Sequence, residues 1–186
     1  MNIFYLHRQP AESATYHCDK HVVKMAIEYA QLLSTAHRML DGDHYIDASS
    51  GRRIQRWRLS ESDREGVLYK ASHVNHPSAI WVRKNKVQYQ YMYELFVSLC
   101  DEYTHRYGRV HMTDYKLRNF LSTPPVNIPT GIFTDPPQCM PDNCKQSITV
   151  NAYREYYIKE KKGFAKWTSR QIPSWFNDQE SNYASQ

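Results

Sequence analysis

The sequence predicts a single, mostly helical domain with one short extended segment. Three long segments repeat apolar residues at steps of three and four, the spacing of one helix face, whereas only residues 3–6 look extended. The 186 residues, of which 41% are hydrophobic, suffice for a core without disulfides or a structural metal. We therefore expect one all-α domain over residues 1–186, with a proline-rich loop at 122–147 and a basic, aromatic C-terminal arm at 163–186.

The first helix is expected over residues 11–39, directly after Pro10. Its apolar positions form two adjacent stripes, and the polar turn at residues 41–43 ends it. Residues 41–59 show no clear period, so we expect an irregular segment there. This segment carries four arginines: Arg52, Arg53, Arg56 and Arg58.

The remaining helices follow from their end signals. A Ser-x-x-Asp pattern at residues 60–63 resembles a capping box, and it would start a short helix that ends near residue 72. A cap at residues 75–76 and a following proline predict a helix over 77–107, which Gly108 ends. Two smaller helices are expected, at 113–121 and 148–161.

Composition excludes several classes of protein. No apolar run approaches the roughly 20 residues that span a bilayer, and the N-terminal sequence does not resemble a signal peptide, so no membrane and a cytoplasmic location are expected. Glycine-rich phosphate loops are absent from the sequence. The net charge of +5 and the 15 tyrosines are compatible with a polyanionic partner, DNA or a nucleotide.

The four cysteines do not follow a metal-binding pattern. Cys18 and Cys100 fall on apolar helix faces and are interpreted as core residues. Cys139 and Cys144 are five residues apart in the proline-rich loop, where they could pair or bind a metal, but they lack C-x-x-C spacing. We therefore expect no cofactor and no metal.

One face of the first helix is unusually polar and borders the apolar face. Its members follow alternating steps of four and three: His17, His21, Lys24, Glu28, Gln31, Thr35 and Arg38. One interpretation is a solvated face with a Lys24–Glu28 ion pair. The other is an active site, in which Glu28 is a general acid/base among cations that bind an anionic substrate. His17 and His21 have the spacing of metal-binding histidines, but no third ligand is evident.

Further substrate-binding candidates lie outside this helix. They are His73, Asn75, His76, Arg83, Gln138 and Trp167. The cluster at residues 73–78 precedes a helix N-terminus, where backbone N–H groups attract phosphate. Gln138 could read a base edge, and Trp167 could stack on a base. The structural alternatives are a plain helix cap, a packed crossing segment and an arm whose rings cover the domain.

The early polar stripe resembles a known family. The sequence Cys18-Asp19-Lys20-His21, followed seven residues after His21 by Glu28, is similar to the first helix of the phage pyrimidine-dimer DNA glycosylases, also called the endonuclease V family. The whole chain also resembles small phage-type proteins with C-D-K-H-V-V-K-M and N-H-P-S-A-I-W-V-R motifs. The resemblance implies an all-α fold and a catalytic Glu28 supported by His21. Substrate contacts are expected from Asp19, Lys20, Gln31 and Arg38.

The same resemblance implies an amine nucleophile that attacks the sugar C1′ of a damaged nucleotide. Here Met1 and Asn2 stand where the family carries an N-terminal threonine. Either the Met1 α-amine or a lysine, Lys24 or Lys20, supplies the nucleophile, or the lyase chemistry is absent. The function expected is a DNA glycosylase, with or without AP-lyase activity, for a damaged or modified pyrimidine. The alternatives are an enzyme of free pyrimidine nucleotides and a non-enzymatic nucleic-acid-binding module.

Overall fold

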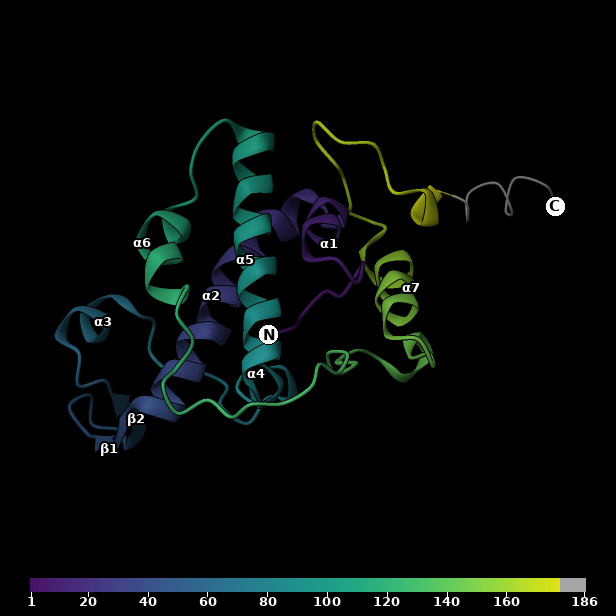
Figure 1. The fold of residues 1–186 in the computed structure, drawn as a ribbon. Coiled ribbons are helices and arrows are strands. Elements are labelled where there is room, and N and C mark those ends of the chain that lie inside the picture. Colours follow the sequence, from purple (N-terminus) through teal and green to yellow (C-terminus); the bar gives the residue numbers. More distant parts are fainter. Residues whose placement is uncertain (178–186) are drawn as a thin grey trace.

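Helices dominate the computed structural model, which describes residues 1–177 (Figure 1). In chain order the elements are α1 (Pro10–Tyr16), α2 (Asp19–Asp41), β1 (Asp43–Asp47), β2 (Ile54–Arg58), α3 (Ser62–Val67), α4 (Pro77–Val82), α5 (Lys86–Tyr107), α6 (Met112–Leu121), the 3-10 helix η1 (Asp142–Cys144) and α7 (Thr149–Lys161). The expected mostly helical fold is confirmed, but β1 and β2 form a small sheet, so the fold is not purely α.

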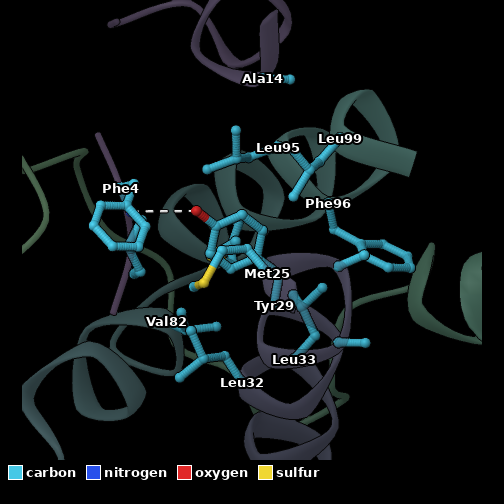
Figure 2. Close-up of a cluster of buried hydrophobic side chains, with 14 of the residues drawn as sticks. Phe4, Ala14, Met25, Tyr29, Leu32, Leu33, Val82, Leu95, Phe96 and Leu99 are labelled. Carbon is cyan, nitrogen blue, oxygen red and sulfur yellow. Dashed lines mark hydrogen bonds between the residues drawn. The ribbon is translucent and has the colours of Figure 1, made fainter. Parts of the chain in front are cut away.

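The core lies where α2 crosses α5. Buried side chains of α2 pack against those of α5, and Phe4 and Val82 close the cluster from the N-terminal segment and from α4 (Figure 2). Burying each large apolar side chain contributes roughly 1.5–3 kcal/mol relative to leaving it exposed, so this crossing stabilises the fold. The core residues labelled on the two long helices are Met25, Tyr29, Leu32, Leu33, Leu95, Phe96 and Leu99.

The helix expected over residues 11–39 is two helices. His17 and Cys18 are extended, with ψ of 132° and 161°, and they separate α1 from α2. Both side chains are fully buried, and the His17 ring bonds with the Ser13 carbonyl and the Tyr29 hydroxyl. These hydrogen bonds favour the interruption of the helix at His17 and Cys18, which the spacing of the apolar residues does not reveal.

The helix expected over residues 77–107 is also interrupted. Asn85 is extended, and its side-chain oxygen accepts the Gln88 backbone N–H, which caps α5. The expected start and stop are confirmed, since His76 caps α4 and Gly108 ends α5 in the left-handed conformation at φ 65°.

Residues 41–59, expected to be irregular, contain an antiparallel hairpin. β1 and β2 pair so that Asp43 lies opposite Arg58 and Asp47 opposite Ile54. The helix that follows is shorter than expected, because α3 covers only 62–67. Glu61, not Ser60, occupies its cap position and makes no side-chain cap bond, so the expected capping box is wrong.

The proline-rich loop and the arm cover the helical body. Within the loop only η1 is helical, and Thr134 accepts bonds from Trp81 and Gln88, which hold the loop against α4 and α5. The arm is described to residue 177, and the part of the expected arm at 178–186 lies outside the described residues. Over the described range, no helix has the length and apolar character required to cross a membrane.

Candidate active site

A chain of hydrogen bonds holds the N-terminal segment in the core. The Phe4 N–H donates to the Tyr29 hydroxyl (Figure 2). This hydroxyl bonds the His17 Nε2 atom, and His17 Nδ1 bonds the Ser13 carbonyl. The Ser13 hydroxyl donates to the Phe4 carbonyl and accepts the Leu6 N–H. Burial lowers the pKa of His17 to about 4, so the ring is neutral at pH 7 and serves as a fixed bridge.

Asn2 fixes the position of the chain's first residue. Its amide nitrogen donates to the Cys139 carbonyl at 2.8 Å, and its oxygen accepts from the Tyr153 hydroxyl at 2.8 Å. Met1 is half-buried, and its sulfur lies 3.8 Å from the Ser72 hydroxyl. The Ser72 N–H in turn bonds the Thr35 hydroxyl of α2. The segment 1–2, the loop 72–76 and α2 therefore meet at one place.

His76 lies at this meeting point. Its Nδ1 atom accepts the Ser78 backbone N–H at 3.2 Å, which leaves Nε2 free to carry the proton. Burial lowers the pKa of His76, the Met1 α-ammonium and His73 lower it further, and Glu28 raises it. The α-amine and the Glu28 carboxylate, two candidate catalytic groups from different segments, therefore have opposite effects on the pKa of His76.

His73 has an unusual backbone. It adopts a positive φ of 49°, which costs energy for a residue other than glycine, and its side chain is exposed. Its carbonyl accepts the His76 N–H and closes a tight turn. Strained residues gather at functional sites, so this turn adds to the case for the 72–76 loop. The neighbouring Asn75 is exposed and does not cap the helix.

Glu28 is the less exposed partner of a helical ion pair. Its Oε1 atom lies 3.1 Å from the Lys24 ammonium, and the side chains are 16% and 69% exposed, respectively. Gln31, one turn further along α2, is half-buried on the same face. The carboxylate is therefore partly shielded from water while the lysine remains accessible, which suits proton transfer at a bound substrate.

Arg83 follows α4 and has an unsatisfied side chain. Within the described residues its Nη1 atom is buried without a hydrogen-bond partner, and burial lowers the pKa of the guanidinium. It directly follows α4, whereas His76 directly precedes it, so the two residues flank this six-residue helix. A half-buried, unpaired guanidinium is costly, so an anionic ligand such as a phosphate would compensate it.

His21 belongs to the core and lies away from this group. Its ring stacks on Phe4 with centroids 4.3 Å apart, bonds the Tyr157 hydroxyl and is 7% exposed. Burial lowers its pKa to about 3, and His17 and nearby lysines act in the same direction. In this arrangement His21 contacts Phe4 and α7, and it has no hydrogen bond to Glu28.

Two neighbours on α2 hold the C-terminal arm. Asp19 accepts from the Thr168 N–H and hydroxyl and pairs with Arg106 at 2.8 Å. Lys20 is exposed, and its ammonium lies 4.6 Å from the centre of the Phe164 ring. Both residues expected to bind substrate are thus occupied by the arm.

Three further candidates also have structural partners. Arg38 is fully buried and donates to Glu65 and to backbone carbonyls around α3 and β2. Gln138 bonds the backbone of Gln146 in both directions. Trp167 is buried and donates to the Tyr16 carbonyl. None of these side chains lies free for base reading or phosphate contact.

Sequence reasoning did not identify the residues that assemble the site. Asn2 and Tyr153 position the first residue, yet they are 151 positions apart, and no motif or period links them. All four cysteines are free thiols, and over residues 1–177 no group of three His, Cys, Asp or Glu side chains is arranged to hold a metal. Comparison with known proteins returned no matching family model, no matching curated protein and no matching solved structure.

Proposed function

We propose that the chain is a DNA glycosylase of the cytoplasm that releases a damaged or modified pyrimidine, with AP-lyase activity at the same site. The supporting observation is that segment 1–2 and α2 both contact Ser72, next to the turn that holds His76. The Met1 α-ammonium lowers the pKa of His76 and Glu28 raises it. Imine-forming cleavage of an N-glycosidic bond requires an amine nucleophile and a group that transfers protons, the roles proposed for Met1 and Glu28.

In the proposed reaction the nucleotide is extruded from the duplex and its C1′ meets the amine. The amine nitrogen bonds to C1′ as the N-glycosidic bond breaks, and the base leaves with the electron pair and takes up a proton. Glu28 takes a proton from the attached nitrogen and passes it to O4′ as the C1′–O4′ bond breaks, so the sugar ring opens to an imine. Removal of a C2′ proton then allows the 3′ phosphate to leave, which breaks the strand.

Residues on the 72–76 loop, after α4 and on α2 are the proposed substrate contacts. Arg83, unpaired among the described residues, binds a flanking phosphate, and the exposed His73 and Asn75 contact the sugar–phosphate chain. The neutral His76 donates a hydrogen bond to the extruded nucleotide through Nε2. Gln31, on the Glu28 side of α2, contacts the base.

The test is base release from duplexes that each carry one modified or dimerised pyrimidine. Glu28→Gln keeps the size of the side chain and removes its proton chemistry, so we expect base release to fall at least about 100-fold. Glu155→Gln is a matched control, because Glu155 forms the same i,i+4 pair with Lys159 at 3.0 Å on α7. Equal rates for the two variants would contradict the role of Glu28.

Borohydride trapping identifies the nucleophile, after the intact mass has established whether Met1 is the first residue. An imine to Met1 disappears when a short N-terminal extension blocks the amine, whereas an imine to Lys24 disappears in Lys24→Ala. The accessible Lys24 Nζ is the alternative amine because it lies beside Glu28. Absence of both base release and a trapped adduct on every duplex would overturn the proposal, and turnover of free nucleotides alone would favour a nucleotide enzyme.

A further inference from the structure

The β1–β2 hairpin is a basic projection that the proposed catalytic group does not use. Figure 1 shows it beyond the C-terminal end of α2, at the side of the molecule away from α7. Gly51, in the left-handed conformation at φ 77°, lies in the turn between the strands. A two-stranded hairpin is only marginally stable alone, so its persistence requires an anchor in the fold.

Arg38 provides this anchor. Its Nη1 atom donates to the Trp57 carbonyl at 2.9 Å and to the Glu65 carboxylate at 2.6 Å. The same carboxylate accepts the Leu59 N–H at the end of β2. Gly42, at the start of β1, lies so close to Trp57 that an added Cβ would stand 3.1 Å from the Trp57 Cβ. The base of the hairpin is therefore held in one position relative to α2.

The far end of the hairpin carries unpaired positive charge. Arg52 and Arg53 are exposed, and within residues 1–177 neither guanidinium has a hydrogen-bond or ion-pair partner. On β2, Arg58 lies 4.8 Å from the centre of the Tyr45 ring, which orients a third guanidinium. Residues 43–58 hold four arginines and two aspartates, which gives this segment a charge of +2.

We propose that this hairpin is a duplex-binding wing whose Arg52 and Arg53 contact DNA phosphates beside the extruded nucleotide. This inference rests on the proposed function, since it takes duplex DNA as the partner. A two-stranded ribbon fits the major groove, and guanidinium groups bind phosphate. The α2 segment from Glu28 to Asp41 spans about 20 Å, on the order of six base pairs, so one duplex can reach the catalytic group and the wing.

The test measures duplex affinity without chemistry. A fluorescent, unmodified 25-base-pair duplex, a length chosen on the order of two helical turns, is titrated with the full chain at several salt concentrations. Each phosphate contact contributes about 0.9 to the slope of log affinity against log salt, so Arg52→Ala/Arg53→Ala should make the slope shallower by about 1.8. The same relation gives a loss of roughly 10- to 60-fold in affinity at 0.1 M salt.

Two variants separate specific contact from general charge. Arg8→Ala/Arg109→Ala removes the same charge from exposed positions elsewhere and should leave the slope within about 0.5 of the unchanged chain. Arg52→Lys/Arg53→Lys keeps the charge and should keep the slope. Two results would contradict duplex binding by Arg52 and Arg53. One is an equal change of the salt slope in the Arg8/Arg109 control and in the Arg52/Arg53 variant. The other is an unchanged slope in the Arg52/Arg53 variant.

Failure of the wing and failure of the proposed function are distinguishable. If binding depends on Arg52 and Arg53 but no duplex shows base release, the hairpin proposal stands and the glycosylase proposal fails. If base release occurs but the salt slope does not depend on Arg52 and Arg53, the glycosylase proposal stands and the hairpin proposal fails. Circular dichroism should show that the tip variants fold, because over residues 1–177 neither exposed arginine has a hydrogen-bond or ion-pair partner to lose.

Discussion

Three buried neutral histidines make the fold sensitive to mild acid. Burial lowers the pKa values of His17 and His37 to about 4 and that of His21 to about 3, from an ordinary value of 6.5. The unfolded chain binds protons at these rings below about pH 6.5, whereas the folded chain does not until pH 3–4. Protons therefore favour unfolding in this window, so stability is complete above about pH 6.5 and falls as the pH drops toward 4.

Linkage gives the size of the effect. Between pH 7 and pH 5 each histidine contributes a loss of about 1.8 kcal/mol, or roughly 5 kcal/mol for the three. Paired carboxylates titrate at lower pH. Burial raises the pKa of Glu65, but hydrogen bonds from Lys70, the Leu59 N–H and Arg38 outweigh burial and lower it to about 2. The loss between pH 7 and pH 5 therefore reports mainly on the imidazoles.

Urea unfolding followed by circular dichroism at pH 7, 6 and 5 measures this loss. His37→Gln retains a side chain that can donate to the Tyr89 hydroxyl but cannot titrate, so the pH-dependent loss should shrink by about one third. His44→Gln changes an exposed ring and should retain the full loss. A free energy of unfolding at pH 5 within about 1 kcal/mol of its value at pH 7 would refute the reasoning.

Two predictions concern the base of the hairpin. Arg38→Met should lower the free energy of unfolding by about 3–5 kcal/mol, because it leaves the Glu65 carboxylate and several carbonyls without their buried donor. Urea unfolding measures this loss, and a change under about 1 kcal/mol would contradict the prediction. Gly42→Ala should cost about 1–3 kcal/mol, because its Cβ would lie 2.5 Å from the Arg38 carbonyl oxygen and 3.1 Å from the Trp57 Cβ. Gly66→Ala, where nothing lies within 4 Å, is the control for thermal unfolding, and equal melting temperatures would show that the space around Gly42 does not matter.

The parts of the fold that local sequence determines were predictable. Gly108 adopts the left-handed conformation that only glycine takes easily, so it marks the end of α5 in the sequence as it does in space. Pro77 at the first turn of α4, after the His76 cap, is a similar local signal. The break at Asn85 carries a local signal, since asparagine is a favoured N-cap and its side chain accepts the Gln88 N–H. The break at His17 also depends on the Tyr29 hydroxyl, which the apolar spacing does not reveal.

The candidate site shows the same division. Helical spacing placed Glu28 and Lys24 together, and they form an ion pair. The same spacing put His21 on that face, but Phe4 covers it, and a helix period does not say which segment packs on which turn. The hairpin was missed because its strands are mostly polar, and the buried contact that holds it comes from Arg38, which looks like a surface residue in the sequence.

The long-range anchoring of the N-terminal segment has a consequence for the newly made chain. Asn2 donates to the Cys139 carbonyl and accepts from the Tyr153 hydroxyl, so the segment cannot complete these bonds until about 150 residues have been synthesised. At ordinary elongation rates of 5–20 residues per second, this takes roughly 8–30 s. During that interval the apolar run at residues 3–6 has no partner from the last third of the chain. The N-terminal segment therefore completes its contacts only after most of the chain has been made.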